Sequence, residues 1–364
     1  MSRQTVFEVR RLDLRCSIGS EVHIVKHLSV CRASHVIVYL DALREIGVPV
    51  DKKLGQSGLP VWIEEMPDAY VSQPLALEFV AKCGNDLSPM ELGFYASERA
   101  TLETLENSFQ RALVDALTGY ARIGTLAKWG HKEDSELSIR LVKEGEKIRV
   151  ICGSGHLARN PFNYLSEWLN LQSLASIISS VAGSEWRPEE LTFMSHHKSP
   201  DAALQTYGNT RILICQPQTS MLVDADVLAR SCIARSESRP LDETYAALCI
   251  ASDDGNEVWN LSDIIRSVVR PYLGEGHPDL THTAEILGIS RRTLQRQLQK
   301  AGRSYSEIVQ EARFEVARDM LSEPAAKIID VAMTAGYENP QHFSRAFRKF
   351  TGVTPSRYRK TLSA

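Results

Sequence analysis

Apolar side chains recur every three to four residues over much of this chain, a spacing that places them on one face of a helix. Glycine, proline and short polar runs separate these segments. In the first part of the chain the pattern predicts helices at residues 34–46, 74–83, 88–96 and 101–120. The last of them is the longest, and Thr101 stands where its hydroxyl can cap the first backbone amides.

The hydrophobic pattern then becomes shorter and mixed. Strands are predicted at residues 123–129, 136–143, 146–152, 191–195, 211–215 and 220–223. The pair Glu144-Gly145 predicts a hairpin turn between the strands at residues 136–143 and 146–152. Residues 161–181 and 201–207 favour helices. We therefore expect an α+β N-terminal sensor domain over residues 1–251, large enough to bury a core and a ligand pocket.

After a predicted helix at residues 241–251, the polar run at residues 252–257 indicates a linker. Residues 258–364 are predicted to form an all-α C-terminal domain. Within it, two short helices separated by a glycine-containing turn occur twice, at residues 281–302 and 328–350. Each copy is a predicted helix-turn-helix motif, because glycine adopts the backbone conformation that such a turn requires.

The second helix of each copy combines an apolar stripe with polar positions. The stripe consists of Leu294 and Leu298 in the first copy and of Phe343, Phe347 and Phe350 in the second. Arginine binds guanine and glutamine binds adenine through paired hydrogen bonds in the major groove, whereas Lys and other Arg side chains suit phosphates. The alternative is a helical bundle whose basic face is simply exposed to solvent. That alternative could account for one such copy, but two copies with matching polar positions favour DNA binding.

Cap residues mark where these helices begin. Ser290 suits an N-cap in the first copy, and Asn339 followed by Pro340 suits one in the second. Between the copies, Ser304 and Glu307 have the spacing of a capping box. The predicted linker helix has roughly 17 residues and a length of about 25 Å, which suits two recognition helices one DNA turn, about 34 Å, apart.

Charge is distributed unevenly along the 364 residues. From Glu257 onward the chain has 16 Lys and Arg against 12 Asp and Glu, whereas the remainder has 26 against 33. A basic C-terminal part joined to an acidic one fits a sensor domain attached to a DNA-binding domain.

The sequence offers little for other classes of function. It contains no membrane-spanning apolar run, no nucleotide-binding Walker loop and no nucleophile elbow. The first residues lack the apolar segment of a signal peptide, and seven dispersed cysteines favour reduced thiols. His196 and His197 would point to opposite faces of a strand, so no metal site is expected. We expect a cytoplasmic protein that is not an enzyme and has no cofactor.

The final ~105 residues closely resemble the AraC/XylS family of bacterial transcription regulators. The resemblance is carried by the run from Gly336 to Phe350 (GYENPQHFSRAFRKF) and by Gly352 to Arg359 (GVTPSRYR). It implies that the base-reading positions are Arg292, Gln295 and Arg296 in the first copy, and Gln341, His342 and Arg345 in the second. The expected phosphate contacts are Arg291, Lys300, Arg348 and Lys349.

The preceding part of the chain resembles the arabinose-binding-type N-terminal domain of some family members. Its matching landmarks are Asn85-Asp86-Leu87, Leu92-Gly93-Phe94, Thr101-Leu102-Glu103, Tyr207-Gly208 and Leu222-Val223-Asp224-Ala225. The resemblance implies a one-component, effector-responsive activator. Its expected partners are double-stranded promoter DNA, RNA polymerase, a small-molecule effector of unknown identity and a second copy of the chain, but no membrane.

Two alternatives remain open for the N-terminal part. The first alternative to an effector sensor is a protein-interaction and dimerisation module without a ligand. The second, which the sequence favours less, is an enzymatic domain fused to the helix-turn-helix unit. The residues that would bind an effector are not identified by the sequence.

Overall fold

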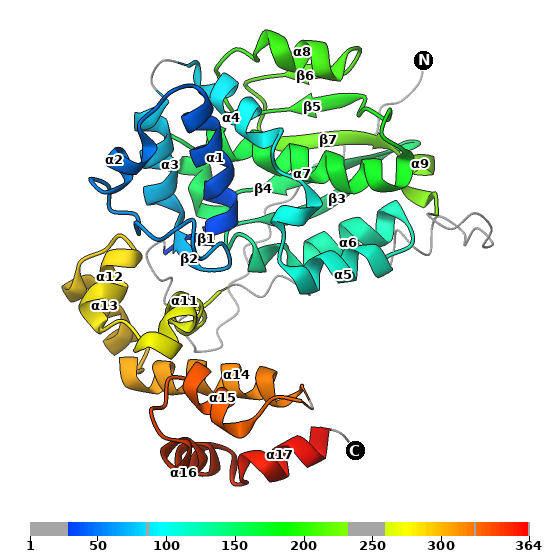
Figure 1. Ribbon diagram of the computed structural model, residues 1–364. Helices are drawn as coiled ribbons and strands as arrows, with labels where there is room; N and C mark the ends of the chain where they lie inside the picture. The colour runs from blue at the N-terminus through cyan, green and yellow to red at the C-terminus, as the bar shows by residue number, and fades with distance from the viewer. Residues whose placement is uncertain (1–27, 85–86, 232–258, 324, 363–364) are drawn as a thin grey trace, which may run out of the picture.

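The computed structural model describes residues 28–84, 87–231, 259–323 and 325–362. It has an N-terminal α+β region and a helical C-terminal region, which lie one above the other in Figure 1. The helix predicted at residues 241–251 and the linker at residues 252–257 lie outside the described residues.

The N-terminal region begins with a small two-stranded antiparallel sheet, in which Val30 pairs with Ser72 and Arg32 with Tyr70. Helices pack beside it and agree with three of the predicted segments. These elements are β1 (Val30–Arg32), α1 (Ala33–Glu45), α2 (Val50–Leu54), β2 (Tyr70–Ser72), α3 (Gln73–Cys83) and α4 (Pro89–Ser97).

A five-stranded sheet forms the second layer, in the order β3-β4-β7-β5-β6. Only the β5–β6 pair is parallel. The predicted hairpin is confirmed, since β3 pairs with β4 and Gly145 in the turn has a φ of 65°. The strands are β3 (Ser138–Glu144), β4 (Lys147–Gly153), β5 (Glu190–Thr192), β6 (Arg211–Leu213) and β7 (Thr219–Asp224).

Helix α7 joins the sheet to the first helices, because it contacts α3, α4, α6 and β7. Near its start Trp168 is fully buried, with its ring 4.9 Å from Phe94 and 4.5 Å from Phe193. The remaining helices of this region are α5 (Asn107–Asp115), α6 (Gly119–Trp129), α7 (Tyr164–Ala182), α8 (Asp201–Tyr207) and α9 (Ala225–Ala229), with 3-10 turns at Leu102–Thr104, Gly130–Lys132 and Gly155–Arg159.

Two predicted elements are wrong. The single helix expected at residues 101–120 is divided, because Thr101 caps only a 3-10 turn and the side chain of Glu106 begins α5 by accepting from the Phe109 amide. Thr118 then caps a new helix, α6. That helix replaces the strand predicted at residues 123–129, since Ile123 and Leu126 are spaced by one helical turn and both are buried.

The argument that separated the two adjacent histidines is also wrong. Strand β5 ends at Thr192, so His196 and His197 lie in a loop, and their ring centroids are 4.2 Å apart. Within the described residues, no group of three or more His, Cys, Asp and Glu side chains could hold a metal ion. Over the same residues, no helix has both the length and the apolar character needed to cross a membrane.

The C-terminal region is built only from helices among its described residues. Its core contains Leu294, Leu298, Phe343 and Phe347 together with apolar residues of the other helices. The elements are α11 (Leu261–Val269), a 3-10 turn (Arg270–Glu275), α12 (Leu280–Ile286), α13 (Arg291–Lys300), α14 (Tyr305–Leu321), α15 (Ile328–Thr334), α16 (Pro340–Thr351) and α17 (Pro355–Leu362).

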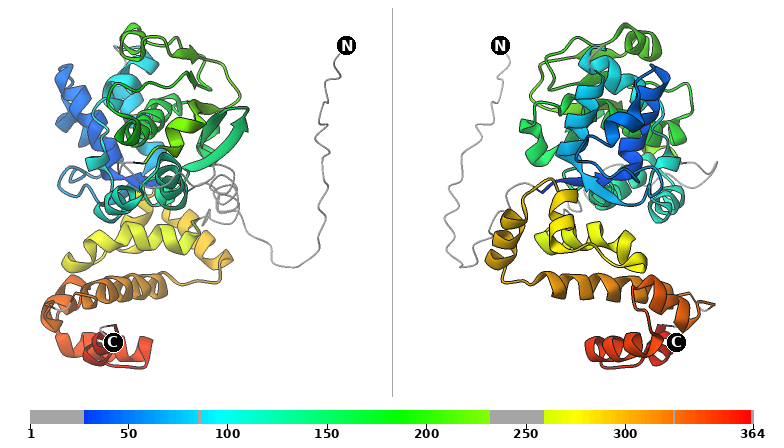
Figure 2. Two further views of the ribbon diagram at one scale, coloured as in Figure 1. Left: turned by 90° about the vertical axis from the view of Figure 1, so that its right-hand side faces the viewer. Right: turned by 60° about the vertical axis from the view of Figure 1, so that its left-hand side comes forward.

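The two regions share an apolar contact. Leu28 and Val30, which precede and begin β1, belong to the same buried cluster as the residues of α11. Aromatic pairs extend it, because Trp62 packs against Tyr272 and Tyr70 packs against Trp259. In both views of Figure 2 the helices coloured yellow lie nearest the N-terminal region and those coloured red lie farthest away.

Candidate DNA-binding surface

The first helix-turn-helix motif consists of α12, a turn and α13. Gly288 in the turn has a φ of 67°, a left-handed conformation that favours glycine. Ser290 caps α13, its hydroxyl accepting a hydrogen bond from the Thr293 amide at 3.2 Å. The sequence prediction of both features is confirmed, and the cap makes α13 begin at the residues that are expected to meet the DNA.

The second motif repeats this arrangement with α15 and α16. Gly336 in its turn has a φ of 79°. A Cβ atom at this position would lie 2.3 Å from the carbonyl oxygen of Leu273. The turn therefore also requires glycine because any larger side chain would clash with this backbone oxygen. Asn339 caps α16 by accepting from the Gln341 amide at 2.7 Å, and Pro340 occupies the first helical position.

The two second helices bury equivalent positions. Leu294 and Phe343 are 0% and 1% exposed, and the residues four positions later, Leu298 and Phe347, are 5% and 3% exposed. The prediction for Phe350 is wrong, because this side chain is 53% exposed. It contacts Phe314 of α14 at a centroid distance of 4.6 Å, but it lies in the last turns of α16 at the edge of the core.

The polar side chains of both helices face away from the core. All six positions that the resemblance assigns to base reading are exposed: Arg292, Gln295, Arg296, Gln341, His342 and Arg345. The four positions expected to contact phosphate are exposed as well: Arg291, Lys300, Arg348 and Lys349. In each helix an arginine, Arg296 or Arg345, stands two residues after the first buried position.

Ion pairs in the C-terminal region form elsewhere. Arg266 of α11 contacts Glu311 and Glu315 of α14 at 3.0 and 2.9 Å, and Arg270 contacts Asp319 at 2.6 Å. Among the described residues, the Arg and Lys side chains of α13 and α16 take part in no such pair. The acidic side chains therefore hold α11 against α14 and leave the cations of the two exposed helices to attract an anion.

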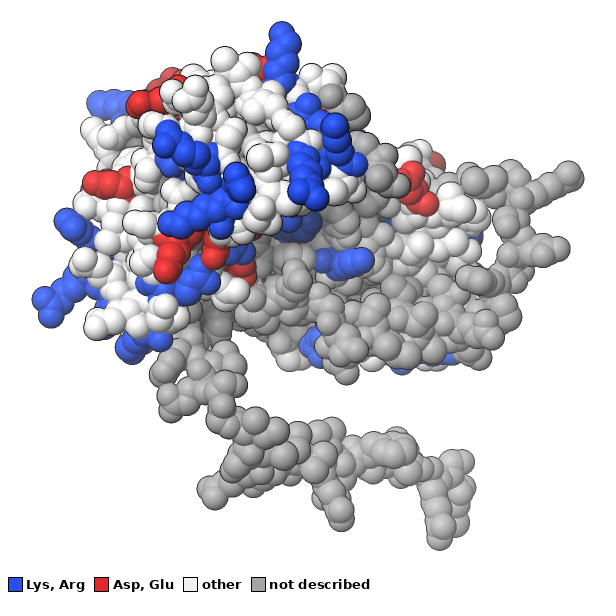
Figure 3. All heavy atoms as spheres, turned by 90° about the horizontal axis from the view of Figure 1, so that it is seen from below, with Lys and Arg blue, Asp and Glu red and all other residues white. Residues whose placement is uncertain are grey.

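The resulting surface is basic. Figure 3 looks at the molecule from the side where the C-terminal helices lie nearest to the viewer, and Lys and Arg side chains outnumber Asp and Glu over the described atoms of that part. Exposed cations with room around them suit the closely spaced phosphates of a nucleic acid.

Sequence reasoning missed one element of this surface. Helix α17 follows α16 and presents Arg357 and Lys360 to solvent. Its signal is the pair Thr354-Pro355, which has the same cap-and-proline form as the pair before α16, and the Thr354 hydroxyl accepts from the Arg357 amide at 3.4 Å. Gly288 also lies against Leu75 and Ser72 of the N-terminal region, a contact that no local sequence pattern indicates.

Comparisons with known proteins agree with this geometry. A model described as a helix-turn-helix domain matches residues 283–361. The ornithine utilization regulator of Pseudomonas aeruginosa is 35% identical over 83 residues, which are 23% of this chain and 24% of that protein. The transcriptional activator NphR of a Rhodococcus species is 31% identical over 117 residues, 32% of this chain and 35% of that protein.

A third similarity extends over nearly the whole chain. The HTH-type transcriptional regulator VirS of Mycobacterium tuberculosis is 21% identical over 333 residues, 91% of this chain and 96% of that protein. This chain thus spans about a quarter to a third of the first two relatives and almost all of the third.

Proposed function

Because the C-terminal region of this chain is a helix-turn-helix domain of the AraC type, found in bacterial transcription regulators, we propose that the whole chain regulates transcription by binding promoter DNA. The observation that supports this most directly is the pair of capped helices, α13 and α16, with exposed and unpaired cations.

The six exposed positions on these helices read bases. Arg292, Arg296 and Arg345 suit guanine, Gln295 and Gln341 suit adenine, and His342 provides ring nitrogens for either. Arg291, Lys300, Arg348 and Lys349 bind phosphates and fix the position of the domain without specifying sequence.

Helix α14 sets the distance between the two reading helices. It has 17 residues and begins with a capping box, in which Ser304 and Glu307 bond each other's backbone amides. A helix of this length extends about 25 Å, so α13 and α16 enter two successive major grooves about 34 Å apart. Each chain then recognises two short half-sites on one side of the duplex.

The N-terminal part, which we assign to residues 1–251, controls the DNA-binding domain at residues 258–364. We assign it to the arabinose-binding type of sensor domain, responding to a small-molecule effector and pairing with a second copy of the chain. The regulator acts in the cytoplasm as an activator that contacts RNA polymerase. An effector changes activity only if its affinity differs between two arrangements of the protein.

Selection from a random DNA library, followed by footprinting of the enriched sequences, tests the proposal. We expect two protected segments whose centres are about 10.5 base pairs apart. A control variant, Arg318→Ala, removes an exposed α14 arginine that pairs with Asp319 and leaves the reading helices intact. Enrichment of no sequence, or protection of one short segment only, contradicts the proposal.

The two other functions of the N-terminal part have separate tests. A thermal-shift screen of metabolites that stabilises nothing favours a protein-interaction module. Turnover of any stabilising metabolite favours an enzyme fused to the DNA-binding domain.

A further inference from the structure

A cavity lies inside the N-terminal region between the small sheet, α1, α3, α6, α7 and β3. We propose that it binds a small primary amine with a short apolar tail, and that the bound amine acts on the first helix-turn-helix motif through β1, β2 and the start of α3. The second half of this proposal rests on the proposed function, whereas the first half does not.

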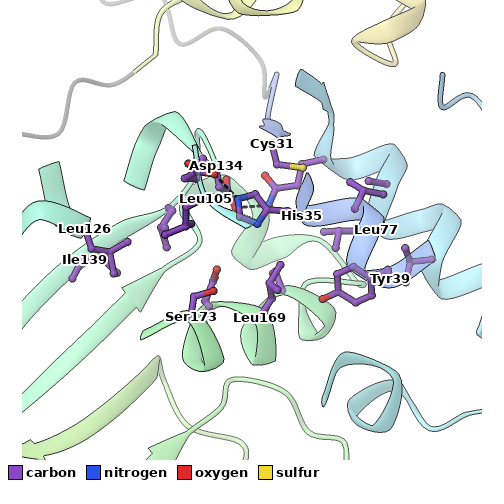
Figure 4. A pocket seen from close by; sticks show the side chains of 18 residues that line it. Cys31, His35, Tyr39, Leu77, Leu105, Leu126, Asp134, Ile139, Leu169 and Ser173 are labelled. Atoms are coloured by element: carbon purple, nitrogen blue, oxygen red, sulfur yellow. Dashed lines mark hydrogen bonds and ion pairs between the residues drawn. The ribbon is translucent and has the colours of Figure 1, made fainter. Parts of the chain in front are cut away.

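The body of the cavity is apolar. In Figure 4, Leu126 and Ile139 lie on one side and Leu77 and Tyr39 on the other, with Leu169 between them. The cavity volume is about 60 Å³. Since one water needs roughly 10–15 Å³ on this measure, the cavity holds about four to six non-hydrogen atoms. An aliphatic tail of three to five carbons therefore fits.

One end of the cavity carries acceptor groups. Gln73 lines the cavity and is 5% exposed, and its Nε2 donates to Asp134 Oδ2 at 2.6 Å, while its Oε1 is fully buried. This buried oxygen has no hydrogen-bond partner among the described residues. A buried acceptor without a donor is costly, so the end of the cavity favours a ligand that brings hydrogen-bond donors.

The charges at this end select a cation. Glu133 is neutralised by Arg32 at 2.9 Å and bonds the His35 ring at 2.8 Å. Asp134, which lies near His35 and Cys31 in Figure 4, accepts from the amides of Gln73 and Glu136 but pairs with no Lys or Arg of the described chain. An ammonium group supplies three donors and the missing positive charge, whereas a carboxylate ligand would face two acidic side chains.

The wall that holds the amine is also the wall that meets the DNA-binding domain. Along β1, Val30 lies in the apolar cluster of α11, and the next residue, Cys31, lines the cavity. Cys31 also forms a backbone bridge with Asp134. Neighbouring residues of a strand point to opposite sides, so one strand contacts both places.

The start of α3 makes the same double contact. Gln73 and Leu77 line the cavity, while Leu75 lies against the turn of the first motif. A Cβ atom at Gly288 would lie 2.9 Å from Leu75 Cδ1 and 3.2 Å from the Ser72 hydroxyl, so the start of α3 packs closely against this turn. A ligand that bonds both Gln73 Oε1 and Asp134 shifts the start of α3, and this shift moves Leu75 against the turn of the first motif.

Calorimetry with the full-length protein tests the site without DNA. The probe is n-butylamine, and the matched controls are 1-butanol, butyrate and ammonium chloride. We expect the dissociation constant of butylamine to be at least tenfold lower than that of butanol, with no binding of butyrate or ammonium. Equal binding of butanol and butylamine, or tighter binding of butyrate, overturns the proposal.

Asp134→Asn tests the anchor. The new amide oxygen still accepts from the Glu136 amide. Once the Gln73 amide turns over, the new amide nitrogen donates to Gln73 Oε1, so the variant keeps its fold while losing both the charge and the unmatched acceptor. We expect at least tenfold weaker binding of butylamine. The control Asp68→Asn changes a carboxylate that bonds Arg32 outside the cavity, and its affinity should equal the wild type. Undiminished binding by Asp134→Asn refutes the assignment.

DNA titrations with and without butylamine test the coupling, using a sequence selected as described above. We expect butylamine to change the DNA affinity of the wild type at least threefold. Leu75→Ala should bind the amine normally but show no such change. Amine binding without any effect on the DNA affinity overturns the coupling and leaves the site intact. A protein that binds the amine and selects no DNA contradicts the proposed function instead.

Discussion

The ring of Tyr70 in β2 packs against the ring of Trp259 at the start of the C-terminal region, with centroids 5.3 Å apart and planes inclined by 53°. Burial raises the pKa of Tyr70 far above its usual range, and its hydroxyl donates to the Lys132 carbonyl oxygen. The same side chain thus contacts both the 3-10 turn before Glu133 and the DNA-binding domain. Among the described residues, Tyr70 is therefore one of those at which the two regions meet.

Trp259→Ala should weaken the contact between the regions. Loss of the aromatic pair and of the partly buried indole costs about 2 kcal/mol of unfolding free energy. In urea denaturation we expect the C-terminal region to unfold at lower denaturant than the N-terminal one. Tyr70→Phe keeps the ring and removes only the hydroxyl, so it should retain a single transition. A single unshifted transition for Trp259→Ala would show that the aromatic pair adds nothing.

Arg345→Ala should reduce specific DNA binding by about 1–3 kcal/mol and relax preference at one base position. Lys349→Ala, four residues later on α16, should weaken binding to every sequence alike. It should also reduce the slope of log affinity against log salt concentration by about 1, because one phosphate contact is lost. Both follow from the exposed positions of these side chains. Affinities measured for a set of singly altered sites at two salt concentrations separate the two effects. A uniform loss from Arg345→Ala would identify it as a phosphate contact.

Gly336→Ala should unfold the second motif. The new Cβ would lie 2.3 Å from the Leu273 carbonyl oxygen, and the backbone has a φ of 79°. The left-handed conformation alone costs about 1–2 kcal/mol for a non-glycine residue, and the backbone contact adds to it. Gly302→Ala is the matched control, because Gly302 has a φ of 62° but open space around it. Thermal melts should show a loss for Gly336→Ala at least twice that for Gly302→Ala.

Acid should destabilise the N-terminal region through Glu133. Burial alone would raise the pKa of this carboxyl, but the hydrogen bond and charge of His35 and the charge of Arg32 outweigh it and lower the pKa from 4.5 to about 2. The ionised form therefore stabilises the fold by about 3 kcal/mol above pH 4.5, and this contribution is lost as the pH falls toward 2.

Urea titrations between pH 6 and pH 3 check this linkage. The difference in unfolding free energy between the wild type and Glu133→Gln should shrink as the pH falls, because the glutamine cannot titrate. A difference that stays constant over this range would mean that the pKa of Glu133 is the same in the folded and the unfolded protein.

Amine binding should weaken in acid. Burial raises the pKa of Asp134 to about 6, although hydrogen bonds from the Glu136 amide and the Gln73 side chain oppose this. Cys31, His35, Glu133 and Glu136 are the other titratable groups near it. Butylamine stays protonated, so its partner must be the carboxylate, and calorimetry should show roughly tenfold weaker binding at pH 5 than at pH 7.5. Asp134→Asn should show no such dependence.

Much of the DNA-binding surface could be predicted because its signals are local. Ser290 and Asn339 cap helices that begin one residue later, and Gly336 stands where the backbone turns left-handed. Each signal depends on fewer than about five neighbouring residues, as caps and turns do. The roles of Arg292, Arg296 and Arg345 at individual bases remain predictions.

The N-terminal region was predicted less well, because its elements depend on packing as well as on local signals. The run at residues 101–120 has a continuous apolar pattern, and the internal caps Glu106 and Thr118 divide it. Residues 123–129 satisfy both a strand and a helix pattern over so short a length, and packing of Ile123 and Leu126 into the core selects the helix.

What the sequence by itself determined is a pair of helix-turn-helix motifs, each specified by its own cap, turn and apolar stripe. What only the tertiary structure decided is where distant residues meet. Gln73 and Asp134 are 61 positions apart, and nothing in the residues around either one indicates the other. The cavity and the contact of Leu75 with Gly288 exist because packing of the whole chain brings these residues together, and such long-range contacts leave no periodic pattern along the chain.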